Sequence, residues 1–215
     1  RESLDESIAD YGNSVLYSSA RNEYMITRLD RLLNRTVWAL TEQLARGDFE
    51  PSAYEMSFGS GKIDRIDVCE TQDEVYVKVI DYKTGQKGFD VSALYYGLQL
   101  QLMVYMNAAT DRMKKRYPGK QVIPSGVFYY RMKDPLLEKN GKADLEKRLL
   151  KELRPDGVVN LEQNSLEHLE RDHTGDSLAV PVKFNNDGSL AKVSRAVRQE
   201  EFHTMMEYAD QKAAE

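Results

Sequence analysis

The stretch GKIDRIDVCETQDEVYVKVIDYKTG, from Gly61 to Gly85, decides the fold of this chain. It predicts two antiparallel strands, Lys62 to Val68 and Val75 to Lys83. Side chains two positions apart share one face of a strand, so the second strand has an apolar face that ends in Asp81 and Lys83. Burial of two charges at that point is costly unless they pair with each other or hold a metal. The hairpin therefore predicts either an ion pair or a metal site.

The first strand of this hairpin carries two further carboxylates. Asp64 and Asp67 are three positions apart, so they face opposite sides of the sheet and only one of them meets Asp81 and Lys83. Two carboxylates on one patch repel unless a hard cation lies between them, and Mg²⁺ prefers oxygen ligands. A lysine beside such a pair orients or deprotonates a water, or stabilises charge on a phosphate.

An acid, a hairpin and then Asp-x-Lys resemble the signature of the PD-(D/E)xK nucleases. In this chain the acid is Asp64 or Asp67, and the second part is Asp81-Tyr82-Lys83. The segments GKIDRID, VIDYKTG and YYGLQLQLMVY resemble the RecB-like branch of these nucleases. They are most similar to the AddB family, which belongs to the ATP-dependent helicase/deoxyribonucleases of Firmicutes. A Gln-x-x-x-Tyr motif follows the lysine strand in that branch, and Gln101 to Tyr105 fit it.

The likeness runs from about residue 23 to the C-terminus and is strongest over residues 55–131. It implies an α/β fold of the restriction-endonuclease type, with a mixed sheet flanked by helices and a C-terminal helix–hairpin–helix addition. It also implies a DNA exonuclease that uses Mg²⁺ or Mn²⁺. In the family pattern the acid after Gly-x-Ile holds the metal, which selects Asp64 over Asp67. Asp64, Asp81 and the backbone carbonyl of Tyr82 would then be the metal ligands, and Lys83 would position the attacking water.

Supporting residues are expected around this centre. The resemblance implies that Gln101 and Tyr105 contact the DNA or steady the lysine; the alternative is that Tyr105 is simply part of the core. Asp67 is a further supporting candidate. Glu55, on the preceding strand, is expected to be a solvated or lysine-paired edge residue, with a supporting role near the metal as the alternative. The pair Tyr95-Tyr96 could stack on bases, although core packing is favoured for at least one of them.

The resemblance also implies partners and a cofactor of a larger protein. The partners are linear DNA ends and an AddA-like helicase/nuclease subunit, which together resect double-strand breaks for recombination. AddB-type domains have an upstream helix that adds a histidine or glutamate to the metal site. They also carry an iron–sulfur cluster on four cysteines, none of which matches Cys69. Because the chain starts at Arg1 and lacks those cysteines, it is expected to be a piece of a longer protein whose activity in isolation is weak or absent.

Two other functions fit the same residues. The first is an inactive DNA-guiding or subunit-docking module, and the presence of both carboxylates and the lysine argues against it. The second is a CRISPR-associated Cas4-like nuclease, and the long segment after residue 140 favours the AddB type instead.

Composition bounds these interpretations. The chain has 215 residues, of which 41% are hydrophobic and 30% charged, as expected for one globular domain. Its net charge of −5 argues against a free-standing nucleic-acid binder, but not against a nuclease to which a larger machine delivers DNA. No apolar run approaches the roughly 20 residues of a membrane span, and no signal-peptide pattern is present. A single cysteine, Cys69, suits a reducing compartment, so we expect a cytoplasmic location.

Periodicity and turn signals predict the remaining elements. The expected domains are a lead-in over 1–20, a nuclease core over 21–132, and a family-specific extension over 133–215 packed on that core. The expected helices cover residues 22–46, 90–112, 142–153 and 194–214. The expected strands cover residues 54–59, 62–68, 75–83 and 122–131, with a hairpin formed by 179–184 and 189–193 and an irregular acidic segment over 158–176. The first helix is expected to bury a stripe made of Ile26, Leu29, Leu33, Val37, Leu40 and Leu44.

Overall fold

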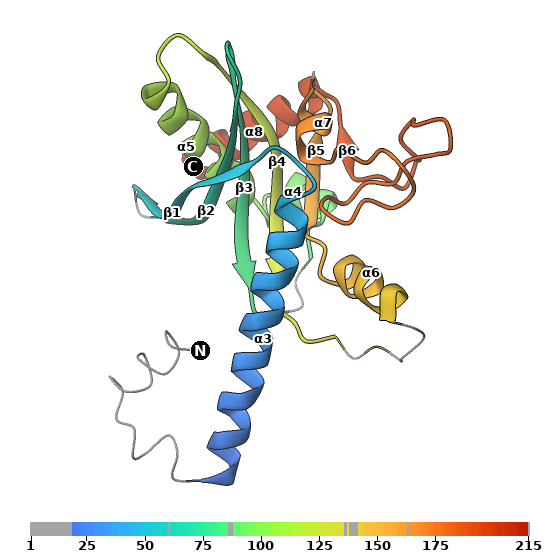
Figure 1. Ribbon diagram of the computed structural model, residues 1–215. Helices are drawn as coiled ribbons and strands as arrows, with labels where there is room; N and C mark the ends of the chain where they lie inside the picture. Colours follow the sequence, from blue (N-terminus) through green and yellow to red (C-terminus); the bar gives the residue numbers. More distant parts are fainter. Residues whose placement is uncertain are drawn as a thin grey trace.

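The computed structural model describes residues 19–59, 61–85, 88–135, 137, 142–162 and 164–214. The predicted lead-in over residues 1–20 lies almost entirely outside the described part of the chain. A six-stranded sheet organises the rest, in the order β1-β2-β3-β4-β5-β6 (Figure 1). The strands are β1 Glu50–Phe58, β2 Gly61–Glu70, β3 Glu74–Lys83, β4 Gln121–Arg131, β5 Asp156–Asn160 and β6 Ala196–Val197. The helices are α3 Ala20–Leu44, α4 Val91–Tyr95, α5 Gln101–Arg116, α6 Lys142–Glu152, α7 Ser165–Leu169 and α8 Gln199–Ala214.

The sheet is mixed, as the predicted fold class requires. Strands β1, β2 and β3 form an antiparallel meander. Strand β4 then runs parallel to β3, because α4 and α5 carry the chain back across one face before β4 begins. The predicted order of helix, three strands, helix and strand is therefore confirmed, and with it the α/β class.

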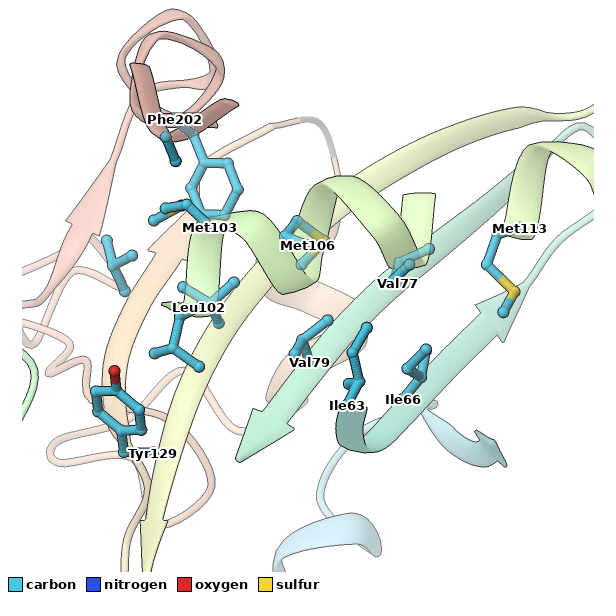
Figure 2. Packing of buried hydrophobic residues seen from close by; sticks show 14 of the residues in the cluster. Ile63, Ile66, Val77, Val79, Leu102, Met103, Met106, Met113, Tyr129 and Phe202 are labelled. Atoms are coloured by element: carbon cyan, nitrogen blue, oxygen red, sulfur yellow. The ribbon is translucent and has the colours of Figure 1, made fainter. Parts of the chain in front are cut away.

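Helices α5 and α8 cover one face of the sheet. Figure 2 shows Leu102, Met103 and Met106 of α5 directed towards the strands, with Phe202 of α8 against Met103. These side chains are fully buried together with the apolar residues of β2 and β3 that point the same way. Close packing of these side chains fixes α5 over the point where β3 and β4 lie side by side. The start of α5 is thereby held beside the end of β3.

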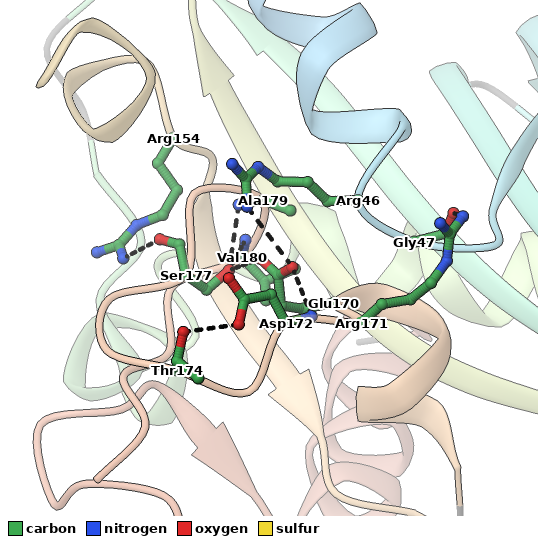
Figure 3. Close-up of polar contacts among 10 residues, drawn as sticks. All are labelled: Arg46, Gly47, Arg154, Glu170, Arg171, Asp172, Thr174, Ser177, Ala179 and Val180. Carbon is green, nitrogen blue, oxygen red and sulfur yellow. Dashed lines mark hydrogen bonds and ion pairs between the residues drawn. The ribbon is translucent and has the colours of Figure 1, made fainter. Parts of the chain in front are cut away.

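The opposite face is covered by α7 and by the segment that follows it. Tyr76, Phe128 and Tyr130 are buried there against Val180 and Phe184. The segment is held by polar contacts around Glu170, which is buried and accepts hydrogen bonds from Ser177 Oγ (2.8 Å) and from Asp172 N (3.2 Å) (Figure 3). Ser177 Oγ in turn accepts from the backbone N–H groups of Ala179 and Val180. These hydrogen bonds satisfy the buried carboxylate of Glu170 and the buried hydroxyl of Ser177 in a loop without regular strands.

Much of the apolar stripe expected on the first helix is exposed, and for those residues the prediction is wrong. Helix α3 buries Thr36, Ala39 and Gln43, whereas Leu29, Leu33 and Val37 are 43%, 37% and 63% exposed. Of the predicted stripe, Leu40 does pack against the core, so the stripe is right only near the C-terminal end of the helix, where the buried side is shifted towards Ala39 and Gln43. Figure 1 shows the N-terminal half of α3 extending beyond the sheet.

The single helix expected over 90–112 is also wrong. Asp90 does cap a helix, because its Oδ1 accepts from Ser92 N at 2.8 Å, but α4 ends at Tyr95. Gly97 then adopts a left-handed backbone conformation with φ +73°, which an α-helix does not tolerate and which glycine adopts at little cost. As a result α5 starts afresh at Gln101.

Three expectations for the C-terminal part need correction. The acidic segment expected to be irregular contains β5 and α7. The expected hairpin of 179–184 with 189–193 is reduced to one isolated antiparallel bridge, Phe184–Leu190, and Lys183 forms a second bridge with Asp176, outside the predicted hairpin. The last helix begins at Gln199, not at Ser194, whose hydroxyl instead bonds to the backbone of Lys183. Residues after 133 therefore extend the sheet by two strands and add α8 to the core.

Candidate active site

Asp64 and Asp81 lie on neighbouring strands on the face that α5 covers. Arg65 of β2 pairs with Ile80 of β3, so one step further Asp64 lies opposite Asp81. Asp64 Oδ2 accepts a hydrogen bond from the backbone N–H of Tyr82 at 2.8 Å, and this bond fixes its carboxylate against β3. The structure thus brings together the two acids that the family pattern selects.

Lys83 completes the group. Its Nζ lies 2.6 Å from Asp81 Oδ2 and donates to Gln101 Oε1 at 3.0 Å. The same Nζ is 5.2 Å from the centre of the Tyr129 ring, a cation–π distance. The ammonium is therefore held by a carboxylate, an amide oxygen and a ring face.

The Gln-x-x-x-Tyr motif starts α5 and reaches the lysine. Gln101 Nε2 donates to Tyr105 Oη at 2.7 Å, one helical turn later, while its Oε1 accepts from Lys83. The Tyr105 ring packs edge-on against Phe58 of β1, with ring centres 5.5 Å apart. Tyr105 thus combines a half-buried ring with a hydroxyl that holds Gln101 in place. Of the two roles expected for this pair, the geometry shows contact with the lysine.

Burial dominates the electrostatics here. Asp81 is only 3% exposed, and desolvation raises the pKa of its carboxyl above the ordinary value, against the opposing effect of Lys83. Tyr129 lies beside it, and burial, reinforced by the charge of Asp81, raises the pKa of its phenol to about 12. The surroundings therefore disfavour negative charge unless further positive charge is supplied.

A divalent cation fits these residues. Asp81 Oδ2 is buried. Lys83 Nζ is close to this oxygen, but Asp81 Oδ2 accepts no hydrogen bond of acceptable geometry from the described residues. Two carboxylates on adjacent strands offer the hard oxygen donors that Mg²⁺ or Mn²⁺ prefers. In the described part of the chain, no group of three or more His, Cys, Asp and Glu residues is placed to hold a metal. The candidate donor set is therefore two carboxylates, completed by backbone oxygen and water.

Asp67 lies away from this centre, on the other face of the sheet. It is fully buried and accepts from Arg65 Nε at 2.6 Å and from Arg65 Nη2 at 2.9 Å, with Lys78 Nζ 3.1 Å away. Burial lowers the pKa of the Lys78 ammonium in this cluster. The expectation that Asp67 supports the site directly is not met, because its carboxylate is enclosed by these two cations.

Glu55 is an edge residue paired with a lysine. Its carboxylate lies 2.7 Å from Lys62 Nζ and is exposed. This agrees with the favoured interpretation of Glu55 as a lysine-paired edge residue rather than with a role at the metal.

Tyr95 and Tyr96 are 74% and 73% exposed, so the core packing favoured for at least one of them is wrong. Their rings contact each other edge-on, with centres 5.4 Å apart. Tyr95 is the last residue of α4, and Tyr96 follows it directly, before the left-handed Gly97.

Comparison with known families gives this geometry a context. The model of the PD-(D/E)XK nuclease superfamily matches residues 1–213. The chain belongs to this superfamily. Asp64, Asp81 and Lys83, the three residues of the acid–hairpin–Asp-x-Lys motif in this sequence, lie together in the structure. None of the helices in the described part of the chain is long and apolar enough to cross a membrane.

Similar curated proteins share one name, that of the B subunit of an ATP-dependent helicase/deoxyribonuclease. The chain is 40% identical to the protein of this name from Lachnoclostridium phytofermentans over 94% of its own length. It is 32% identical to those from Alkaliphilus oremlandii and Acetivibrio thermocellus, over 95% and 96% of its length. The chain spans only 19% to 20% of the length of these relatives.

Two residues of the site were missed by the sequence analysis. Tyr129 and Arg131 on β4 pair in register with Asp81 and Lys83, and in a parallel pair such partners share a face. The predicted parallel crossover placed residues 122–131 beside 75–83. Alignment of the C-terminal ends of these two predicted strands, residues 131 and 83, would have placed Tyr129 beside Asp81 and Arg131 beside Lys83.

Proposed function

We propose that this chain is a metal-dependent deoxyribonuclease domain that hydrolyses phosphodiester bonds with Mg²⁺ or Mn²⁺. One observation carries the proposal: Asp64, Asp81 and Lys83 converge on one face at the end of β3, and Lys83 contacts both Asp81 and Gln101. Membership of the PD-(D/E)XK nuclease superfamily supports it.

Each residue has a role that follows from its position. Asp64 and Asp81, with the backbone carbonyl of Tyr82, would hold the metal. When bound, Mg²⁺ would neutralise charge on the phosphate and lower the pKa of a water. Lys83 orients the attacking water and offsets charge that develops on the phosphate. Acid–base and electrostatic effects of this kind typically raise the rate about 10²–10⁴-fold. Gln101 and Tyr105 hold the lysine in its orientation.

The names of the relatives support a wider setting for this domain. It would be the exonuclease of an AddAB-type helicase–nuclease that digests linear DNA ends together with an AddA-like partner, in the cytoplasm, during recombinational repair of double-strand breaks. The iron–sulfur cluster implied by the AddB resemblance does not fit the residues present. Cys69, the single cysteine, is buried in β2, so this chain does not supply a four-cysteine ligand set.

Digestion of end-labelled linear DNA tests the proposal. The wild-type chain, Lys83→Ala and Lys114→Ala are incubated with single- and double-stranded DNA and Mg²⁺ or Mn²⁺, with EDTA as the blank. Lys114 is a matched control, because it lies at the far end of α5, is exposed, and within the described residues pairs only with Asp111, at 3.9 Å. Cutting by wild type and Lys114→Ala that fails in Lys83→Ala is the expected result. Equal cutting by all three contradicts the proposal. Because the isolated chain is expected to be weakly active or inactive, absence of cutting by all three is followed by the same comparison in the full-length parent protein. Equal cutting by that protein with and without Lys83→Ala, or no cutting by it, contradicts the proposal and favours an inactive module.

A further inference from the structure

A groove opens beside the candidate active site, between α3 and the ends of β3 and β4. Its volume is about 530 Å³, and Thr84 and Gly85, directly after Lys83, form part of its wall. Arg131 lines the same groove, and its Cα pairs in register with that of Lys83. Met132 N donates to Lys83 O at 3.0 Å, so the groove is continuous with the strand that carries the catalytic lysine.

Two arginines in this groove have no acidic partner among the described residues. The guanidinium groups of Arg28 on α3 and Arg131 on β4 make no ion pair or hydrogen bond with any residue that the structure describes. Their neighbours differ, because Arg31 and Arg35 both contact Asp134, and Lys133 contacts Glu152 at 3.1 Å. In a chain with a net charge of −5, two uncompensated guanidinium groups at one groove favour an anionic ligand.

Four of the other lining residues are apolar, and the charged ones, Lys133 and Asp134, are already paired. Met25, Leu29 and Leu32 of α3 and Met132 after β4 face the groove. Leu29 is 43% exposed and Met25 54% exposed, on the half of α3 that extends past the sheet (Figure 1). A groove lined by apolar side chains together with two unpaired arginines matches a single nucleic-acid strand, whose unpaired bases offer flat apolar faces and whose backbone offers phosphates. A duplex offers only phosphates and groove edges to such a wall.

We propose that this groove binds a single strand of DNA adjacent to the bond that is cut. Arg28 and Arg131 contact its phosphates, and Met25, Leu29 and Leu32 pack against its bases. The proposal rests on the proposed nuclease function and adds to it the path of the strand and the residues that position it. In this proposal the exposed apolar residues near the start of α3 contact the bases of the bound strand.

Binding without cutting provides the test. Fluorescence anisotropy of a labelled oligothymidylate is measured in EDTA over a range of salt concentrations, with the whole chain of residues 1–215. Each phosphate contact contributes about −0.7 to the slope of log K against log salt for a single strand. Arg28→Ala and Arg131→Ala should each reduce the steepness of this slope by about 0.7. Lys114→Ala, which removes an equal charge outside the groove, should leave it unchanged.

A second variant separates the bases from the phosphates. Leu29→Ala should weaken oligothymidylate binding several-fold at all salt concentrations without a change in slope, and should have no effect on binding of a blunt duplex. Circular dichroism melts of each variant verify the fold. Because Leu29 and Arg28 are exposed, these variants should fold as wild type does.

The outcomes distinguish the two proposals. Unchanged slopes in both arginine variants, or no binding of oligothymidylate by wild type at low salt, overturn the groove assignment whether or not the chain cuts DNA. Altered slopes together with DNA cutting that Lys83→Ala leaves undiminished, in this chain or in the full-length parent protein, support the groove and overturn the nuclease assignment. An effect of Leu29→Ala on duplex and single strand alike overturns the contact with bases.

Discussion

Asp64 accepts a hydrogen bond from the backbone N–H of Tyr82, and this bond ties the carboxylate of one strand to the peptide between Asp81 and Lys83 on the next. On the opposite face, Arg65 Nη1 donates to the Tyr82 hydroxyl at 3.3 Å. Tyr82 is therefore held from both sides of the sheet. The spacing of the two acids in the candidate metal site depends on this arrangement.

Asp64 and Asp67 should respond differently to the same substitution. Asp67→Asn leaves Arg65 and Lys78 buried beside a neutral amide, so it should lower the free energy of unfolding by about 3–5 kcal/mol. Asp64→Asn removes a carboxylate that makes no ion pair in the described structure and should cost less than about 1 kcal/mol. Urea denaturation followed by circular dichroism measures both. Equal destabilisation by the two variants would argue against the division of roles between these acids.

Gln101 should act through Lys83. Gln101→Ala removes the acceptor for the lysine ammonium, and a lost supporting contact of this kind typically costs about 10–100-fold in activity. Tyr105→Phe removes only the hydroxyl that holds Gln101, so its effect should be smaller. In the double variant the Tyr105 substitution should add almost nothing, because its contact is already gone. Rate measurements at saturating DNA test this, and full additivity would show that Tyr105 acts independently of Gln101.

Stability should depend on pH through Asp48. Its carboxylate accepts from Arg171 Nε (2.9 Å) and lies 2.9 Å from His168 Nδ1, and the His168 contact lowers the pKa of Asp48 below its ordinary value of 3.8. A depressed carboxyl pKa stabilises the fold above pH 3.8, and this contribution is lost as the pH falls through the folded pKa. Asp48→Asn should therefore lower stability at about pH 6 by about 0.2–1 kcal/mol, as is usual for partly exposed pairs.

The control for this prediction is Asp111→Asn, which changes an exposed carboxylate on α5. The difference between wild type and Asp48→Asn should shrink towards zero in acid, whereas Asp111→Asn should track wild type throughout. A difference between wild type and Asp48→Asn that grows on acidification would refute the assignment.

Cys69 should be unreactive in the folded chain. Burial raises the pKa of its thiol from 9.0 to about 11, so at about pH 8 the thiolate fraction is about 100-fold lower than for an ordinary thiol. Reaction with a disulfide reagent such as DTNB should be slow in buffer and fast in urea. Cys69→Ser should leave DNA cutting unchanged, because the thiol lies on the face of the sheet opposite Lys83. Rapid labelling of the native chain would contradict the burial.

The centre of the site was predictable because strands have a fixed period. Alternation alone placed Asp81 and Lys83 on one face and separated Asp64 from Asp67, and helical spacing brought Gln101 to Tyr105. The choice of Asp64 came from the family pattern, and the structure brings that residue to Asp81.

Other features depend on tertiary contacts that the sequence does not display. A helical period does not say which side of α3 packs, and Leu29, Leu33 and Val37 were placed on the wrong side. The end of α4 depends on the left-handed conformation of Gly97, and glycine within a helical pattern is compatible with either outcome. Strand β5 is only five residues long and is specified by its pairing with β4 rather than by its own composition.

Cutting of end-labelled single-stranded DNA by wild type, Asp64→Asn and Asp111→Asn, with Mg²⁺ and with EDTA, tests the central claim most directly. Loss of a residue next to a metal ligand costs about 10–100-fold, so loss of a ligand should cost at least about 100-fold. We predict Mg²⁺-dependent cutting by wild type and Asp111→Asn, no cutting in EDTA, and a loss of that size in Asp64→Asn with an unchanged melting curve. Undiminished cutting by folded Asp64→Asn would contradict the metal site.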